Sequence, residues 1–417
     1  MTRIKIRNFG PIQGGLQEDD GWIDVKKVTV FIGNQGSGKS TIAKLISTLI
    51  WIEKALVRGD YNKKWFERKN RFKNQCLAYH RIENYLKDKG DNHTRIEYLG
   101  DAYDISYFQG QLSIKEREII SYPLPQIMYV PAERNFITYV KTPKELKLSS
   151  DSLKEFLTEF DNAKSDMRGM LRLPINDVNL EYDRLNDVLN LRGDAYRVRL
   201  TEASSGFQSL VPLFLVSDYL GNSVKRQSVS HRETMTTEEL ARFKSGVEDI
   251  FTNESLTDEQ KRAAISILSS KFNKTAFINI VEEPEQNLFP SSQWQMLESL
   301  LKINNMNNGN KLILTTHSPY LIMFLNLAIQ GNYVKDKIIE AKKIDKILPK
   351  LSNVLSIDAL VSSESVVVYQ LLEISGEIKK LPAPFGIQSD KNFLNEMLRE
   401  GNKMFDSLLE IEEDLTV

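Results

Sequence analysis

A glycine-rich segment followed by a lysine and a serine stands near the start of the chain. It runs from Gly33 to Ser40 in the pattern GxxxxGK[ST], between a short β-branched apolar run and a stretch with helical spacing of apolar residues. Glycines permit the tight turn in which successive backbone N–H groups point at one anion, and the start of a helix adds partial positive charge. This pattern in this context is typical of a phosphate-binding loop rather than of a chance glycine-rich turn.

We therefore predict that the segment binds ATP. Lys39 is expected at the β- and γ-phosphates, and the Ser40 hydroxyl is expected to be a ligand of Mg²⁺. The predicted ATP-binding residues of the segment are Asn34, Gln35, Gly36, Ser37, Gly38, Lys39, Ser40 and Thr41.

Two adjacent carboxylates, Glu282 and Glu283, end a second apolar run at 277–281. At the end of a strand beside a phosphate loop, the first carboxylate holds Mg²⁺ through water and the second orients or deprotonates the attacking water. We predict Glu282 as the metal residue and Glu283 as the base for hydrolysis of ATP to ADP and phosphate. The alternative is an acidic pair that merely ends a strand at the surface.

A histidine, His317, ends a third apolar run at 311–315. A histidine in this place can contact the γ-phosphate and act in catalysis. A lone histidine at a strand end is more often an ordinary hydrogen-bonded polar group. The order of the three motifs along the chain favours the catalytic interpretation.

The elements that must position these residues are predicted from periodicity. Buried, parallel-type strands alternate with helices, which indicates an α/β sheet covered on both faces. Strands are expected at 3–7, 27–32, 95–99, 103–108, 127–130, 196–200, 276–281, 311–315, 366–371 and 378–381. Helices are expected at 39–56, within the polar stretch 53–95, over 151–192, and at 210–220, 237–246, 257–271, 291–304 and 390–412.

These elements suggest five segments. An N-terminal lobe, 1–135, carries the phosphate loop and a basic helical insertion at about 53–95, and a helical lobe follows at 136–221. A helical insertion at 222–275 separates it from the second part of the core, 276–389, and an acidic helix, 390–417, ends the sequence.

Bulk composition excludes several function classes. The 55 Lys and Arg residues balance 56 Asp and Glu residues, so no overall field marks a nucleic-acid binder. The single Cys76 cannot form an intramolecular disulfide, which favours a reducing compartment. No run approaches the roughly 18 apolar residues needed to cross a bilayer, and the first residues lack the apolar stretch of a signal peptide. We expect no membrane association and a cytoplasmic location.

Together these motifs resemble the ABC-ATPase superfamily, in its branch with the SMC-like and overcoming-lysogenization-defect (OLD) ATPases. Glu285–Pro290 stands where that family has its D-loop, and Ala203–Gln208 stands in place of its signature motif. The resemblance implies an ABC-ATPase head, with a core sheet flanked by helices, an N-terminal antiparallel β lobe and helical insertions. It also implies that Ser204, Ser205 and Gly206 of one copy close over ATP on another, in a homo-oligomer built from dimers that extends up to a hexamer.

Within that superfamily, the Glu-Glu-Pro-Glu and Thr-Thr-His-Ser-Pro segments resemble the AriA-type ATPase subunits of PARIS antiphage defence systems. This implies a sensor and scaffold that holds a TOPRIM-type nuclease effector and releases it on detecting a phage protein, such as a DNA mimic. Septu-type ATPases with an HNH nuclease share the motifs. A DNA-repair or chromosome-maintenance ATPase and a nucleotide-binding scaffold without turnover are further alternatives, and direct nucleic-acid contact stays open.

Three regions carry weaker expectations. The Q-loop is placed at Pro131–Arg134 by position, with Gln126 and Gln109 as rivals, and Phe9 or Trp22 is a candidate to stack on adenine. Basic and aromatic residues alternate over 63–73, which fits either a nucleic-acid or acidic-protein contact or a solvated helix with a buried aromatic face. The acidic C-terminal helix is expected to dock on the body by its apolar face, with its acidic face outward.

Overall fold

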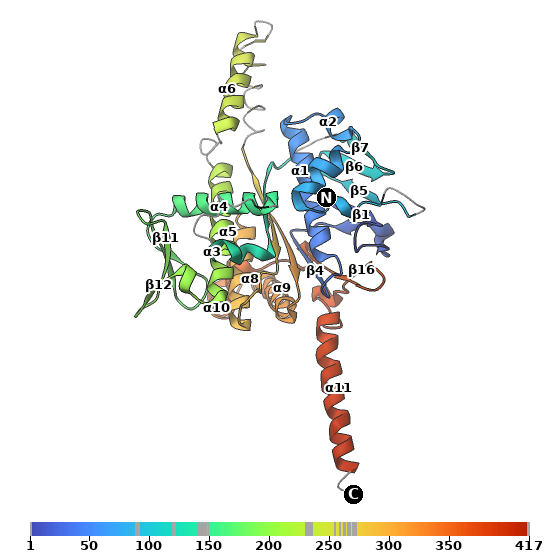
Figure 1. Cartoon of the computed structure of the whole chain (residues 1–417). Helices are drawn as coiled ribbons and strands as arrows, with labels where there is room; N and C mark the ends of the chain where they lie inside the picture. Colours follow the sequence, from blue (N-terminus) through green and yellow to red (C-terminus); the bar gives the residue numbers. More distant parts are fainter. Residues whose placement is uncertain are drawn as a thin grey trace.

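The computed structural model of the chain describes residues 2–87, 92–118, 122–139, 148, 150–229, 237–253, 256, 257, 260, 261, 264, 268 and 273–414. In this part of the chain, three β-sheets are surrounded by helices, and two long helices extend from opposite ends of the body (Figure 1). The predicted α/β class is confirmed. None of the described helices has the length and apolar character needed to span a bilayer.

A seven-stranded sheet forms the centre of the molecule, in the order β2-β16-β15-β4-β14-β13-β8. The strands β15, β4, β14, β13 and β8 pair in parallel, and β16 is antiparallel to β15. The strand bounds are β2 Gly15–Leu16, β4 Val28–Gly33, β8 Pro125–Val130, β13 Ala276–Glu282, β14 Lys311–Thr316, β15 Val366–Leu371 and β16 Glu377–Lys380. The strands predicted at the phosphate loop, the acidic pair and the histidine are thereby confirmed.

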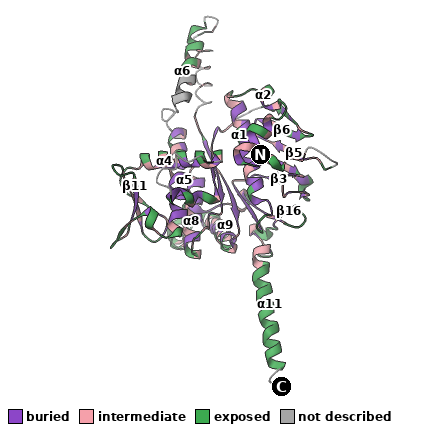
Figure 2. Ribbon diagram, viewed as in Figure 1, coloured by how far each residue is buried: buried purple, intermediate pink, exposed green. Residues whose placement is uncertain are grey.

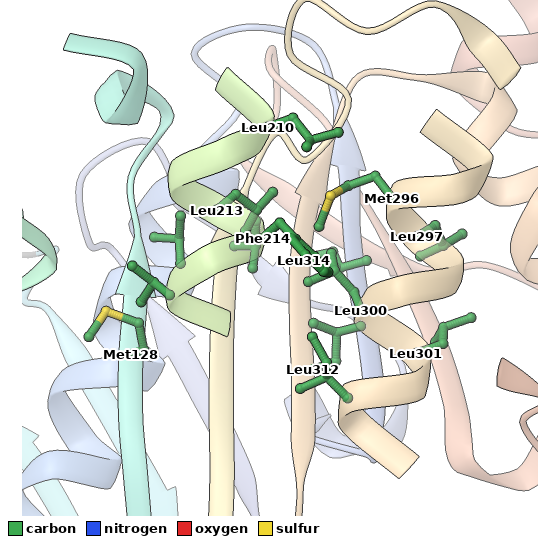
Figure 3. Close-up of a cluster of buried hydrophobic side chains, with 14 of the residues drawn as sticks. Met128, Leu210, Leu213, Phe214, Met296, Leu297, Leu300, Leu301, Leu312 and Leu314 are labelled. Atoms are coloured by element: carbon green, nitrogen blue, oxygen red, sulfur yellow. The ribbon is translucent and has the colours of Figure 1, made fainter. Parts of the chain in front are cut away.

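The central strands are apolar throughout because both faces of their sheet are covered. In β4, Val30 packs on one face and Phe31 on the other. The first face is covered by α4 Asp151–Asp166, α5 Ser205–Val229, α8 Pro290–Asn305 and α9 Pro319–Glu340. Figure 3 shows part of this core, in which Leu213 and Phe214 of α5 lie among Leu300 of α8 and the sheet residues.

The second face is covered by α1 Lys39–Arg58 and by an antiparallel sheet in the order β3-β1-β5-β6-β7. Its strands are β1 Arg3–Arg7, β3 Ile23–Asp24, β5 Arg95–Leu99, β6 Tyr103–Phe108 and β7 Gln111–Glu116. Apolar residues alternate along β1 and β6, so one side of this sheet packs on α1 and the other faces solvent. The predicted antiparallel N-terminal lobe is confirmed.

The stretch 151–192 is not helical throughout, which corrects the prediction for it. After α4 the chain forms a second antiparallel sheet in the order β12-β11-β10-β9. Its strands are β9 Leu171–Arg172, β10 Asn179–Asp183, β11 Val188–Arg192 and β12 Arg197–Arg199. The reason is local: the buried Leu180 and Leu191 pair across β10 and β11, and Asp187 takes a left-handed conformation (φ 50°) in the turn between them.

Up to residue 87, the basic stretch predicted to be helical forms short helical pieces rather than one helix. They are the end of α1, α2 Lys63–Glu67, a π-helical turn at Phe72–Leu77, and 3₁₀ turns at Ala78–His80 and Glu83–Tyr85. Phe66 and Phe72 are buried. Trp65 stacks on Tyr61 with ring centroids 4.1 Å apart, and the Arg71 guanidinium lies 4.4 Å from the Trp65 ring. The aromatic residues therefore serve packing here, and nucleic-acid contact stays an untested prediction.

The remaining helices are α3 Phe136–Tyr139, α6 Thr237–Thr252, α10 Ile344–Ser352 and α11 Phe393–Asp414. Most of the helix predicted at 257–271 lies outside the described residues. The C-terminal helix exists, but its expected docking is wrong for the single chain: α11 has no buried residue and extends into solvent (Figure 2). The division into five segments stays a prediction.

Candidate functional site

The phosphate loop, the acidic pair and the histidine meet at one edge of the central sheet. They follow β4, β13 and β14, which are neighbouring parallel strands, with β14 between the other two. The carboxyl ends of parallel strands lie at the same edge of a sheet, which is the usual place for a ligand site in this class of fold. The structure thus brings together the three motifs that the sequence placed up to 284 positions apart.

The backbone of the phosphate loop has the form that an anion site needs. Gly36 (φ 76°) and Gly38 (φ 101°) take left-handed conformations that other residues rarely adopt. Gly38 is the N-cap of α1, where no side chain accepts from the first N–H groups of the helix and no acidic residue lies in the first turn. These N–H groups and the helix dipole therefore remain available to phosphate.

The Lys39 side chain folds back onto the start of the phosphate loop. Its Nζ donates to the backbone carbonyls of Gly33, at 3.0 Å, and of Asn34, at 2.8 Å. Burial lowers the pKa of Lys39 to about 8, although the carboxylates of Glu283, Glu285 and Glu282 act in the opposite direction. The nearby carboxylates show that the lysine and the acidic pair share one electrostatic environment.

We expect the affinity for ATP to fall by about tenfold between pH 7 and pH 9, because phosphate binds the charged ammonium and a pKa of about 8 leaves mostly neutral amine at pH 9. Bound phosphate raises the lysine pKa, so binding above pH 8 takes up a proton. Titration with a fluorescent ATP analogue at pH 7, 8 and 9 measures this. A Lys39→Arg variant is the control, because guanidinium does not titrate in this range, and an equal pH slope in both proteins would contradict the assignment.

The other predicted loop residues line the same turn. Asn34, Gln35 and Ser40 are exposed, whereas Thr41 and Ser37 are buried in the first turn of α1 and in the loop. The exposed Ser40 hydroxyl is accessible to a metal ion at the edge of the sheet. Asn34 Nδ2 donates to Oε2 of Glu373 at 2.8 Å, which ties the loop to the turn after β15. The roles of these residues in binding ATP stay predictions.

Glu282 is buried at the end of β13, with 4% of its surface exposed. Its Oε2 accepts a hydrogen bond from the backbone N–H of Ala132 at 3.1 Å. The buried Tyr129 hydroxyl also interacts with this carboxylate, which contributes to the raised pKa of Tyr129, but within the described residues Oε1 has no hydrogen bond of good geometry. A buried carboxylate oxygen that is not fully hydrogen-bonded is costly unless a cation or water satisfies it. The arrangement therefore fits Mg²⁺ held by Ser40 and, through water, by Glu282.

Glu283 follows at once and takes an uncommon backbone conformation, with φ at 45°. Its N–H donates to the carbonyl of Thr315 at 2.9 Å, and its Oε1 lies 3.4 Å from Nε2 of His317. The contact with His317, ahead of the charges of Lys39 and Arg134, holds the pKa of Glu283 below its ordinary value. The carboxylate is therefore ionised at neutral pH and able to accept a proton or a hydrogen bond from water.

Glu285 was predicted only as part of the D-loop, and the structure gives it a definite contact. Its Oε1 accepts from the Thr316 hydroxyl at 2.8 Å and from the His317 backbone N–H at 2.7 Å. Burial raises the pKa of this carboxyl group. Glu285 thus fixes the backbone from which His317 reaches Glu283. The only sequence signal for this role is its place two residues after Glu283.

Arg134 is a residue whose role sequence reasoning missed. It lies at the predicted Q-loop, but its side chain is 1% exposed and turned inward. Its guanidinium donates to the carbonyls of Glu282 at 2.7 Å, Glu283 at 2.6 Å and Ser209 at 3.0 Å. Burial lowers its pKa to about 10, and it remains charged at neutral pH. Arg134 therefore joins the backbone of both acidic residues to α5.

The predicted signature residues lie at the start of α5. Ser204 and Ser205 are exposed, and Gly206 lies so close to Asn287 that an added Cβ would come within 2.9 Å of the Asn287 carbonyl oxygen. Asn287 Nδ2 also donates to the Ser209 hydroxyl at 2.9 Å. Among the hydrogen bonds and ion pairs of the described residues, none joins Ser204, Ser205 or Gly206 to the phosphate loop. Their contact with ATP stays a prediction.

The structure bears on the candidates for the Q-loop and for the residue that stacks on adenine. Gln126 pairs with Phe277 at the start of β8 and β13, away from the acidic pair, and Gln109 lies in the turn between β6 and β7. Pro131–Arg134 directly adjoins Glu282. Phe9 is fully buried and packs edge-on against Tyr85, so it cannot stack on adenine.

Comparison with known proteins gives one family match. The model described as "AAA ATPase domain" matches residues 60–322. The matched range starts after the phosphate loop and includes Ser204, the acidic pair and His317. Thus the family match and the Gly33–Ser40 motif are independent observations on different parts of the chain. No match was found among curated proteins.

Solved structures similar to this chain include SMC heads and an ATP-binding cassette. The SMC head bound to the C-winged helix domain of ScpA has 8% identity, covers 91% of this chain and 96% of that chain, and has a TM-score of 0.35. The SMC head domain from Thermotoga maritima has 9% identity, 91% and 97% coverage, and a TM-score of 0.33. The dimeric ATP-binding cassette MJ0796 in a post-hydrolysis state, bound to ADP and Pi, has 10% identity, 91% and 96% coverage, and a TM-score of 0.26.

Proposed function

Since the chain belongs to the family of the AAA ATPase domain, we propose that it is an ABC-type ATPase that binds ATP with Mg²⁺ between two copies of itself and hydrolyses it. The observation that carries this proposal is the meeting of Lys39, Glu283 and His317 at one edge of the central sheet, beside a helix start free for phosphate. In this arrangement the helix start binds the phosphates, Lys39 neutralises their charge and Glu283 acts as the base for water.

Each group has a distinct task in the proposed reaction. The N–H groups of the loop and of the start of α1, together with Lys39, hold the β- and γ-phosphates. Glu283, held ionised by His317, orients and deprotonates the attacking water, and His317 contacts the γ-phosphate. Mg²⁺ at Ser40 and Glu282 would neutralise charge on the phosphate oxygens when it is bound. The left-handed backbone at Glu283 sets the direction of its carboxylate, and Arg134 holds it there.

A second copy is part of the proposal because, among the described residues, no hydrogen bond or ion pair joins the signature residues to the phosphate loop of their own chain. Ser204 and Ser205 are exposed at the start of α5, where a hydroxyl and a helix N-terminus present donors outward. Donors from outside that complete the charge cage around the γ-phosphate stabilise its transition state. ATP bound between two copies also couples nucleotide binding to association.

The coupling has a physical route within each chain. Arg134 and Asn287 both bind Ser209, in the first turns of α5, and Arg134 also binds the carbonyls of Glu282 and Glu283. A shift of α5 when its start engages a neighbour's ATP is therefore transmitted to the catalytic carboxylate of the same chain. The test measures ATP hydrolysis and molar mass in the same samples. The molar mass should increase when ATP is added, and turnover should occur only in samples that show this increase. A monomer with full turnover would contradict the proposal.

We further propose that this ATPase is the sensor and scaffold subunit of a bacterial antiphage complex with a partner nuclease, of the kind that PARIS systems contain. The support is the resemblance of the motifs around Glu283 and His317. Co-purification with the product of the neighbouring gene, with mass measured with and without ATP, tests this. A TOPRIM nuclease is the expected partner and an HNH nuclease indicates the Septu alternative. ATP-dependent DNA binding without any nuclease would favour the repair alternative instead.

A further inference from the structure

The C-terminal helix α11 extends from the body into solvent (Figures 1 and 2). A row of large apolar side chains along it is uncovered. Between 43% and 69% of the surface of each of these residues is exposed: Met397, Leu398, Met404, Phe405, Leu408, Leu409 and Ile411. A helix of 22 residues with one apolar side is marginal in water unless that side packs against something. The apolar side of α11 is therefore an incomplete interface.

The spacing of these residues indicates what packs there. Alternating steps of three and four residues connect Leu394, Met397, Gly401, Met404, Leu408 and Ile411. This is the heptad spacing of a helix that packs along its length against another helix. Leu398 and Phe405 lie beside this row and widen it, as in helical bundles. A helix of about 33 Å needs a partner of similar length, and a second α11 has that length.

The charges of α11 determine the orientation of such a pair. Its first half, 393–403, has two acidic residues, Glu396 and Glu400, and two basic residues, Arg399 and Lys403. The second half, 404–414, has five acidic residues and no basic one. A parallel pair would place the two acidic halves side by side. An antiparallel pair separates the two acidic halves, because each then lies beside a half in which two acidic and two basic residues balance, and it also aligns the helix dipoles favourably.

We propose that α11 forms an antiparallel pair with α11 of a second copy of this chain, as an interface separate from the ATP site. In this register Met397 lies opposite Leu408 and Gly401 opposite Met404. Leu394, which packs against the core of the body, lies at the end of the seam beside Ile411. The central pair matches in size, because no atom lies within 4 Å of a Cβ added at Gly401 and the long Met404 side chain fills that space. Leu398 and Phe405 of the two copies meet along one flank.

The pair forms without nucleotide, which separates it from the proposed ATP-dependent contact. In a Lys39→Ala background without ATP, sedimentation at micromolar concentration should show a dimer. Met404→Glu with Leu408→Glu should raise the dissociation constant by about 100-fold or more, because two charges from each copy would be buried in the seam. These side chains are exposed in the single chain, so folding should be unaffected, as circular dichroism can verify.

Asn395→Glu with Asn402→Glu is the matched control, since it adds the same charge to the same helix at two polar positions on the side away from the seam. Its dissociation constant should change by less than about threefold. Equal dissociation of both variants would overturn the proposal. A Lys39→Ala protein that is monomeric without nucleotide would also overturn the proposal. The same holds if that monomer binds phosphatidylcholine vesicles through α11.

Cross-linking tests the orientation. Cys76 is buried, so an added cysteine on α11 is the reactive one. A Met397→Cys copy and a Leu408→Cys copy, co-expressed with different tags and oxidised, should form a disulfide with each other, and neither should link efficiently to itself. Efficient linking of each variant to itself, without the mixed product, would show a parallel pair and overturn the proposed register.

Discussion

Replacing Glu283 with Gln is expected to lower kcat by about 10²- to 10⁴-fold while ATP stays bound. The amide has nearly the same shape as the carboxylate but cannot accept a proton from water. Glu283 is ionised in the native protein because its contact with His317 lowers its pKa. Hydrolysis should therefore fail at the chemical step, and the ATP-bound oligomer should accumulate because it no longer converts to the ADP form.

Single-turnover hydrolysis and molar mass in ATP with Mg²⁺ measure this prediction. Glu364→Gln is a matched control, since Glu364 is an exposed carboxylate at the start of β15, away from the site. Its turnover should equal that of the wild type. If the Glu283→Gln protein hydrolyses ATP within about threefold of wild type, Glu283 is not the base, since general-base removal has a far larger effect.

Replacing Arg134 with Leu is expected to lower the free energy of unfolding by about 3–5 kcal/mol, the cost of breaking a buried charged network. Leucine fills part of the space but leaves the carbonyls of Glu282, Glu283 and Ser209 without their donor. Lysine should not restore the loss, because one ammonium cannot match the planar fork that reaches all three. Urea denaturation measures the loss.

The role of Arg134 in positioning requires a second readout. Under conditions where the Arg134→Lys protein is still folded, kcat should fall more than the affinity for ATP. The phosphate loop is unchanged in this variant, whereas the backbone of Glu283 is no longer held in position. Arg95→Leu is the control, since Arg95 is exposed and its side chain pairs with Glu97 at the surface. The unfolding free energy of this variant should change by less than about 1 kcal/mol. Equal destabilisation of both proteins would contradict the network.

The parts of the site that sequence alone predicts are those encoded locally. The phosphate loop has its glycines, lysine and serine within eight residues. The acidic pair stands at the end of one apolar strand, and His317 stands at the end of another. Short-range patterns of this kind fix both the element and the place of the residue within it. The α/β class follows for the same reason, since strands buried on both faces read as continuous apolar runs.

The parts that sequence misses depend on partners far along the chain. Nothing near Arg134 indicates that its guanidinium binds the carbonyls of residues 148 and 149 positions away. Helix is predicted where β9–β11 form because these strands are short and their period-two signal is weak, whereas the strand predicted at 196–200 contains β12. The docking predicted for α11 is wrong for the single chain, because an amphipathic pattern indicates that one side of a helix is apolar but not which surface covers that side.

One mixing experiment tests the central claim, that Lys39 of one copy and Ser204 of another hold the same ATP. Lys39→Ala and Ser204→Arg proteins should each be inactive alone. Mixed in equal amounts, they should recover about a quarter of wild-type turnover, because half of the dimers then contain one intact site out of two. Full activity of the Ser204→Arg protein alone, or a mixture that stays inactive although mixed dimers form, would contradict a site shared between copies.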